Sequence, residues 1–188
     1  MNKKKRTKFQ ALGMAALLFF TSSAVTFADA PEETAAAHEQ PALIGMPNPM
    51  VEYTSIPEMQ DALGFLPLTL PESMYTCTNR YIIAKSTADL RYTTRDTERP
   101  STYCIRSARQ TSFPSSQDIS GMYGFTWWPH FISRTNVFLA KTGDSSYAAR
   151  WSNDQYLFSA TADNVDEADF NDELLHLVST TEEDYTRK

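Results

Sequence analysis

Between residues 75 and 162 the chain alternates apolar and polar positions in short segments that are separated by polar turns. This period of two predicts β-strands that bury one face. About six strands are expected, at 75–84, 88–95, 102–109, 131–141, 145–152 and 155–162. Most of the turns between them are short, and a short turn joins antiparallel strands. The pattern therefore predicts one antiparallel sheet.

The last two turns predict how the C-terminal strands pair. Gly143-Asp144 and Asn153-Asp154 suit two-residue hairpin turns, in which positive φ angles are tolerated. Counting back from them places Phe138 opposite Ala149, and Ala149 opposite Phe158. Alternation then predicts one face that these three residues share with Ala140, Tyr147, Trp151, Tyr156 and Ala160. The other face is expected to carry Val137, Leu139, Ser146, Arg150, Leu157, Ser159 and Thr161.

Apolar positions recur at helical spacing on both sides of these strands. Ser55 can cap a short helix that ends at Gly64, with Glu58 at the capping-box position. A second helix is expected from about residue 165 or 166 to residue 180, with an apolar stripe of Phe170, Leu174, Leu177 and Val178. The predicted fold class is α+β: a single curved antiparallel sheet with the short N-terminal helix and the C-terminal amphipathic helix packed on one face.

The first 28 residues have the pattern of a secretory signal peptide. A basic start is followed by an apolar run at 11–20, and Thr26 and Ala28 supply small residues for cleavage. The run is about ten residues long and therefore shorter than the roughly 20 that span a membrane. We expect cleavage after Ala28; retention as a membrane anchor is the alternative.

The rest of the chain divides into three expected parts. Residues 29–42 are acidic and rich in Ala and Pro, with little to bury, so they predict a disordered tether. The globular α+β domain is expected at 43–180, and residues 181–188 are expected to be a frayed tail. The size of the domain suits one hydrophobic core.

Charge narrows the range of partners. The signal segment carries five of the 17 basic residues and none of the 23 acidic ones, so cleavage leaves a net charge of −11. Such a chain repels nucleic acid and anionic lipid heads. No later segment is long and apolar enough for membrane insertion. We expect a secreted or cell-envelope-associated protein whose partner is an envelope protein, a peptide, a lipid or a glycan.

The chain has two cysteines, Cys77 and Cys104. Outside the cytoplasm they can form a disulfide, provided that their Cα atoms lie within about 7 Å of each other. A strand is expected between their two strands, which favours the alternative that they are separate small hydrophobic residues. No CxxC pattern is present, so a redox role is not indicated.

The densest unusual cluster is the aromatic run from Tyr123 to Phe131. Aromatic side chains combine a large contact area with a polar tip, and they gather at recognition surfaces. Tyr123, Trp127 and Trp128 are therefore the candidate ligand contacts. The alternative is ordinary strand alternation, with Trp127 pointing inward and Trp128 at a sheet edge marked by Pro129.

Candidate catalytic residues are few. His130 can act as a general base if a nearby Ser or Asp joins it, which leaves an extracytoplasmic hydrolase as an alternative function. The sequence contains no GxSxG, HExxH, CxxC or SxxK pattern. Arg106 and Asp118 are expected to form an ion pair across the long loop at 110–122.

Metal binding is not expected. The acidic run Asp163, Asn164, Asp166 and Asp169 lacks the glycine and the alternating oxygen ligands of a calcium loop, so it predicts the start of a helix. No cofactor is expected either.

Several short segments resemble a known family. They are Gly45 to Tyr53, the helix that Ser55 caps, Gly64-Phe65, Ile105 to Ala108, Asp118 to Tyr123, Ala148 to Ser152 and the acidic final helix. Together they resemble a domain of unknown function that is common in exported and membrane-anchored proteins of Gram-positive bacteria. The resemblance covers about residues 43–180. The two cysteines and the aromatic run depart from its usual pattern.

The resemblance implies a curved antiparallel sheet with helices against it, similar to lipoprotein-carrier and sigma-regulator extracytoplasmic domains. Those relatives bind lipids or protein segments and are not enzymes. We therefore expect a secreted or cell-envelope binding module without catalytic activity. The alternatives are the hydrolase that uses His130 and a regulatory ectodomain without a small ligand.

Overall fold

The computed structural model describes residues 49–95, 98–113 and 118–185. In chain order, its elements are β1 (Met50–Glu52), α1 (Ile56–Leu63), β2 (Tyr75–Ile83), β3 (Thr87–Thr94), β4 (Thr102–Arg109), the 3-10 turn η1 (Gln110–Ser112), β5 (Trp128–Ile132), β6 (Thr135–Gly143), β7 (Ser146–Ser152), β8 (Tyr156–Asp163) and α2 (Glu167–Asp184). The expected signal peptide and tether lie outside the described residues.

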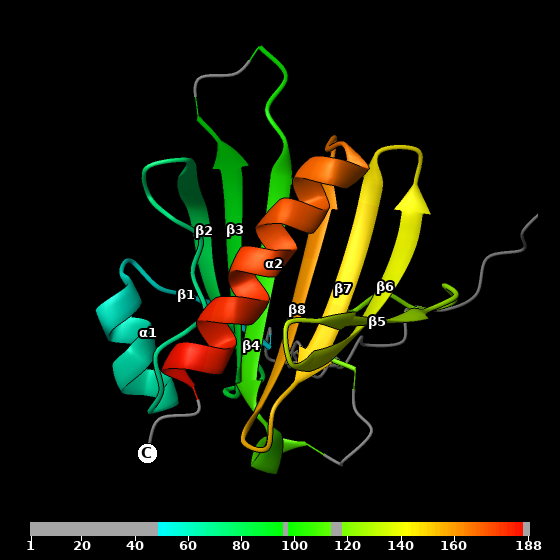
Figure 1. The fold of residues 1–188 in the computed structure, drawn as a ribbon. Coiled ribbons are helices and arrows are strands. Elements are labelled where there is room, and N and C mark those ends of the chain that lie inside the picture. The colour runs from blue at the N-terminus through cyan, green and yellow to red at the C-terminus, as the bar shows by residue number, and fades with distance from the viewer. Residues whose placement is uncertain (1–48, 96–97, 114–117, 186–188) are drawn as a thin grey trace, which may run out of the picture. The chain divides into compact units, whose positions relative to one another are not determined.

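The strands form one antiparallel sheet in the order β1-β2-β3-β4-β8-β7-β6-β5 (Figure 1). The α+β class and the single antiparallel sheet are confirmed. The described residues contain eight strands rather than about six. One difference is β1, which has only three residues. The other is the segment expected as one strand at 131–141, which is divided between β5 and β6 by a turn at Ser133-Arg134.

β6 pairs with β7 one residue away from the predicted register. Phe138 lies opposite Arg150, and Leu139 lies opposite Ala149. Because side chains alternate along a strand, a shift of one residue moves each side chain of β6 to the other face. Val137 is consequently buried, and Phe138 is 41% exposed. The prediction that Phe138 and Ala149 share a face is therefore wrong, as is the outer placement of Val137 and Leu139.

A β-bulge explains this shift. Gly143 pairs with Ser146, so the two turn residues are Asp144 and Ser145. The ladder is irregular between Lys141 and Gly143. An extra residue in one strand reverses the alternation of that strand beyond it. The hydrophobic pattern of β6 does not reveal the bulge, because β6 carries apolar residues on both faces.

The β7–β8 hairpin retains the predicted faces. Ala149 lies opposite Ala160, and Trp151 lies opposite Phe158. Each pairing is two residues from the prediction, and an even shift does not exchange the faces. Trp151 and Phe158 stack with their ring centroids 5.6 Å apart. The shared face of Ala149, Trp151 and Phe158 is therefore confirmed.

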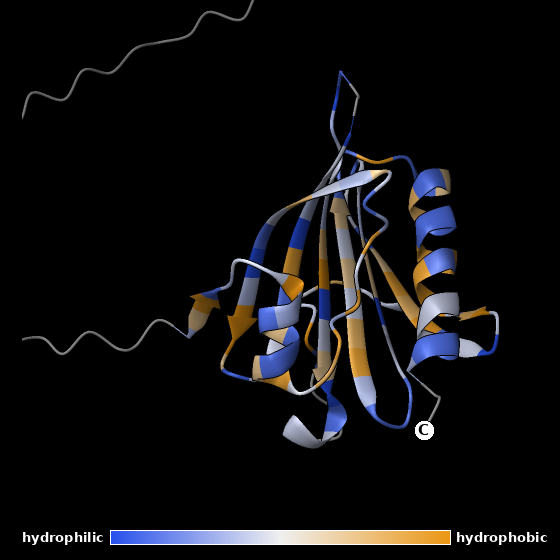
Figure 2. Cartoon of the chain, turned by 90° about the vertical axis from the view of Figure 1, so that its left-hand side faces the viewer, coloured by the Kyte–Doolittle hydropathy of each residue, from blue (hydrophilic) through white to orange (hydrophobic). Residues whose placement is uncertain are grey.

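One face of the sheet, here called the helix face, packs against α2 (Figures 1 and 2). Tyr147 of β7 stacks on Phe170 of α2 at 5.5 Å. Nε1 of Trp151 donates a hydrogen bond to Oγ1 of Thr181 at 3.1 Å. Figure 2 shows α2 to one side of the sheet, with much of its outer surface hydrophilic. The largest fully buried apolar side chains of the domain are Phe158, Met59, Leu68, Leu90, Ile105, Leu174 and Leu177.

α2 continues four residues beyond its predicted end. Thr181 is buried, and the ring of Tyr185 packs edge-on against Phe158 at 5.1 Å. The Tyr185 hydroxyl donates to the carbonyl oxygen of Leu66 at 2.6 Å. The helix therefore extends into the segment that was expected to fray from residue 181.

The start and end of α1 follow the sequence signals. Oγ of Ser55 accepts a hydrogen bond from the backbone N–H of Glu58 at 3.4 Å. Gly64 has a φ of +71°, the left-handed conformation that favours glycine at a helix end. Met59 is completely buried, so the short helix is held by packing.

The opposite face of the sheet, here called the polar face, contains a buried charge cluster. Asp89 is fully buried, and its two carboxylate oxygens accept hydrogen bonds from Nε of Arg91 at 3.1 Å and from Nε of Arg106 at 2.8 Å. Arg106 also donates to the carbonyl oxygens of Ile119 and Ser120. The backbone of this loop is thereby held against the sheet.

Asp118 pairs with Arg150 at 2.5 Å. The expected pair between Arg106 and Asp118 is therefore wrong. Arg106 lies opposite Asp89 in the sheet and bonds to it instead of to Asp118. Asp118 lies in the loop and bonds to Arg150, so both residues still help to hold this loop against the sheet.

The cysteines lie on different faces. Cys77 of β2 lies opposite Tyr92 and packs against the core, whereas Cys104 of β4 lies opposite Arg91 on the polar face. Both are free thiols, so the disulfide considered from the sequence is not formed. Burial, together with the negative charge of Asp89, raises the pKa of Cys104 to about 12. Its thiol is therefore protonated at neutral pH.

Candidate functional site

A groove of about 580 Å³ lies between the β5–β6 hairpin and α2. Its volume falls in the range of roughly 300–1,000 Å³ that small-molecule sites occupy. The larger apolar and aromatic side chains that line it are Trp128, Phe131, Ile132, Leu139, Tyr147, Phe170 and Leu175. Polar residues in the lining include Lys141, Glu167, Asn171 and Asp172. This arrangement suits a ligand with an apolar body and a polar end.

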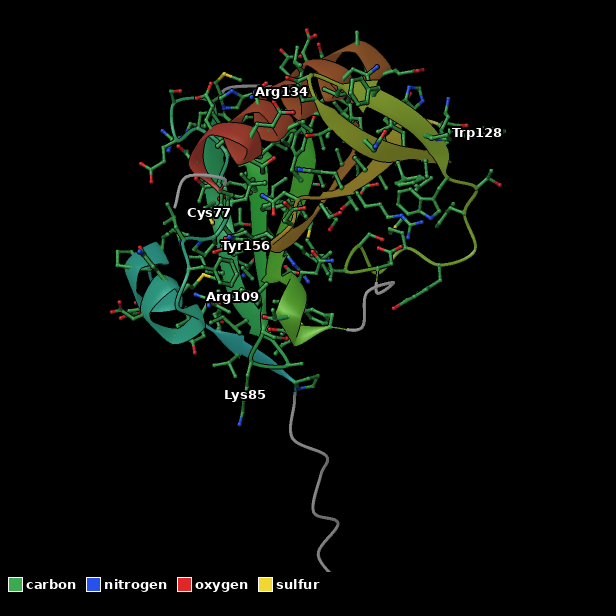
Figure 3. All side chains as sticks on the ribbon, turned by 60° about the horizontal axis from the view of Figure 1, so that its bottom comes forward. Cys77, Lys85, Arg109, Trp128, Arg134 and Tyr156 are labelled. Atoms are coloured by element: carbon green, nitrogen blue, oxygen red, sulfur yellow. The ribbon has the colours of Figure 1, made fainter. Side chains whose placement is uncertain are left out.

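The sheet pairing places the strand residues of the groove. Trp128 lies opposite Leu139, and His130 lies opposite Val137. Leu139 and Val137 are on the helix face, so alternation directs Trp128 and His130 toward the same side as α2. Figure 3 shows Trp128 at the outer end of β5. Because β5 is the last strand of the sheet, this wall of the groove borders solvent.

Large apolar side chains at the groove remain partly in water. Trp128 is 63% exposed, Leu175 is 49% exposed and Phe131 is 70% exposed. Exposed apolar side chains that gather at a concave site mark binding surfaces more often than isolated ones do. Covering them with an apolar ligand stabilises a complex by about 25 cal/mol per Å² of area removed from water, before the cost of association.

Glu182 fixes the turn of the β5–β6 hairpin against α2. Its carboxylate accepts hydrogen bonds from the Ser133 hydroxyl at 2.8 Å, the Arg134 backbone N–H at 2.8 Å and the Thr135 hydroxyl at 2.7 Å. Burial opposes its ionisation, but these hydrogen bonds outweigh that effect and lower the pKa of Glu182 to about 2. Figure 3 shows Arg134 beside the helix. The hairpin is therefore held at its turn.

The structure separates the three predicted contacts. Trp128 lines the groove. Trp127 lies on the polar face, where Cζ of Arg150 is 4.4 Å from the centroid of its ring. The same guanidinium lies 5.5 Å from the ring centroid of Phe138. Tyr123 is 81% exposed and does not line the groove.

His130 also lines the groove, together with the carboxylates of Glu167 and Asp172. Among hydrogen bonds of the described residues, none joins His130 to either carboxylate. Within the same described ranges, no three His, Cys, Asp or Glu side chains gather as metal ligands. The hydrolase that uses His130 stays a prediction.

Sequence reasoning missed most of the apolar residues of the groove, including Ile132, Leu139, Tyr147, Phe170 and Leu175. The register error in β6 placed Leu139 on the wrong face. Tyr147 was placed on the correct face, but as a core residue without a neighbouring cavity. Phe170 was assigned to the buried stripe of the helix. Leu175 had a usable signal, since it lies next to that stripe at a position that a fully amphipathic helix fills with a polar residue.

Comparisons with known proteins do not extend this picture. No family model matches the chain, and no curated protein or solved structure matches it. The resemblance to the exported Gram-positive domain stays a prediction. None of the helices among the described residues has the length and apolar character needed to span a membrane.

Proposed function

We propose that this protein is a non-enzymatic binding module of the cell envelope or the extracellular space, and that the groove between α2 and the β5–β6 hairpin is its ligand site. The observation that carries the proposal is the groove of about 580 Å³ with Trp128 and Leu175 half exposed in its lining. The signal-peptide pattern and the acidic chain support the location.

The chemistry of the lining favours an elongated apolar ligand such as a lipid acyl chain. Trp128, Leu139 and Phe170 offer contact to methylene groups, each of which contributes about 0.8 kcal/mol when buried. Lys141 lies at the groove with its Nζ 5.7 Å from the centroid of the Tyr147 ring. Its ammonium group can interact with a polar or anionic head group.

A pair of matched substitutions tests this proposal. Leu175→Lys places a charged group in the groove, and Leu66→Lys makes the same change at a leucine with nearly equal exposure, 49% against 50%, outside the groove. The measurement is titration with the neutral apolar probe N-phenyl-1-naphthylamine, followed by its fluorescence. We expect Leu175→Lys to weaken probe binding about tenfold or more, which corresponds to about 1.4 kcal/mol.

Leu66→Lys is expected to bind the probe like the unsubstituted chain. Thermal unfolding of both variants shows whether the fold is retained. Leu175 lies in α2, where Lys and Leu have similar helix propensity, Leu66 lies outside the helices, and neither side chain is buried. The groove is not the site if the probe binds Leu175→Lys with unchanged affinity, or if both variants lose binding equally.

A further inference from the structure

A second cavity, of about 840 Å³, lies against the same helix but toward strands β2 to β4. It is bounded by the first half of α2, by the start of β2 at Tyr75 and by the start of β4 near Tyr103. Apart from Asp172, none of its lining residues lines the groove proposed above. It therefore needs its own explanation.

Glu173 is the buried polar group of this cavity. The residue is only 7% exposed, and its Oε2 accepts a hydrogen bond from the Tyr75 hydroxyl at 2.7 Å. Burial and the adjacent Glu173 carboxylate raise the pKa of Tyr75, so its hydroxyl remains a donor. The second oxygen, Oε1, has no hydrogen-bond partner. An unpaired buried carboxylate oxygen is costly, and a donor from a ligand offsets that cost.

Negative charge extends from Glu173 along the helix. Asp166, Asp169 and Asp172 also line the cavity. At a rise of 1.5 Å per residue they are distributed over about 9 Å. The positive end of the helix dipole acts mainly on the first turn, and Glu173 lies beyond it. The lining also contains Arg99, which is exposed, and His176.

The other walls are partly apolar or aromatic, and Thr94, Ser101, Ser145 and Asn164 add polar groups. Met74 is 53% exposed, and Val165 lies beside the start of α2. The rings of Tyr75 and Tyr103 meet edge to face with centroids 5.2 Å apart. Such walls suit methylene groups, and tyrosine rings also attract cations. Carboxylates that are spread out between apolar walls fit an extended cation better than a compact ion.

We propose that this cavity binds a linear aliphatic diamine or polyamine. One primary ammonium group lies against the Glu173 carboxylate, and it donates a hydrogen bond to Oε1 when the side chain turns this buried oxygen toward the cavity. The methylene chain lies against Met74 and Val165, and a second ammonium group lies near the aspartates of α2. This site is separate from the apolar groove, and its occupation does not depend on the function proposed for that groove.

Calorimetric titration of the purified chain with cadaverine at low ionic strength tests the proposal. Glu173→Gln removes the charge and replaces one oxygen by an NH₂ group, while its amide oxygen can still accept from Tyr75. Glu183→Gln makes the same charge change at an exposed position of the same helix. We expect Glu173→Gln to weaken cadaverine binding about tenfold or more and Glu183→Gln to change it by less than about twofold.

Two further measurements keep the test decisive. Met74→Lys introduces an ammonium group of the chain itself at an exposed position of the cavity, so it is expected to abolish cadaverine binding even if Glu173→Gln does not fold. Tetramethylammonium has a charge but no N–H donor, and we expect it to bind far more weakly. The proposal is overturned if the unsubstituted chain shows no saturable binding at low millimolar cadaverine, if Met74→Lys binds normally, if Glu183→Gln is as weak as Glu173→Gln, or if tetramethylammonium binds equally well.

Discussion

Trp127 and Trp128 are neighbours in the chain, but they lie on the two different faces of the sheet. Trp127 packs on Arg150 among the ion pairs of the polar face, and Trp128 lines the groove beside α2. The polar face is held by specific charged contacts, whereas the helix face is held by apolar packing and leaves cavities beside α2. Exposure alone therefore does not define a binding residue; the partners of each side chain do.

The largest expected effect is on the polar face. Asp89→Ala removes the acceptor for Arg91 and Arg106 and leaves the Arg106 guanidinium, which is 20% exposed, without its carboxylate. Breaking a buried ion pair typically costs 3–5 kcal/mol. Because Arg106 retains its bonds to two loop carbonyls, we expect a loss of about 3 kcal/mol in the free energy of unfolding, measured by urea denaturation.

Asp89→Asn is the matched control, since it keeps the shape and an acceptor oxygen while removing the charge. It is expected to be less destabilising than Asp89→Ala. If both variants unfold at the midpoint of the unsubstituted chain, the buried cluster does not stabilise the polar face, and the contrast between the two faces is lost.

A smaller effect is expected where the β5–β6 hairpin meets α2. The folded-state pKa of Glu182, about 2, is below its ordinary value of 4.5. A lowered pKa stabilises the fold above the unfolded value, and this contribution is lost as pH falls from about 4.5 to about 2. We therefore expect Glu182→Gln to be less stable than the unsubstituted chain at pH 7, with a difference that shrinks through this range.

Thermal unfolding of the two chains at a series of pH values measures this difference. Glu183→Gln is the control, because it removes an exposed carboxylate one residue away. If the difference in unfolding temperature between Glu182→Gln and the unsubstituted chain stays constant from pH 7 to pH 2, the carboxylate does not anchor the hairpin.

The sequence predicted the fold best where one face of a strand is apolar. β7 and β8 were placed on the correct faces because the polar Arg150 separates Ala149 from Trp151, and the polar Ser159 separates Phe158 from Ala160. β5 was missed as a separate strand because it contains Pro129 and four of its five residues are exposed. An edge strand has little buried surface, so its hydrophobic pattern is weak.

The candidate site was predictable only in part. The aromatic run directed attention to Trp128, but the bulge in β6 decides which residues share its side of the hairpin, and a bulge has no hydrophobic signature. The burial of Asp89 could not be predicted from the sequence either, because an aspartate in a strand ordinarily predicts an exposed position. Both features depend on partners that are distant in the chain.

The most direct test compares Trp127→Ala with Trp128→Ala in probe binding and in thermal unfolding. We expect Trp128→Ala to weaken binding of N-phenyl-1-naphthylamine about tenfold with an unchanged unfolding temperature. We expect Trp127→Ala to keep the affinity within about twofold and to lose about 1 kcal/mol of stability, the scale of a cation–π contact. The opposite result, in which Trp127→Ala abolishes binding and Trp128→Ala does not, would contradict the assignment of the ligand site to the helix face.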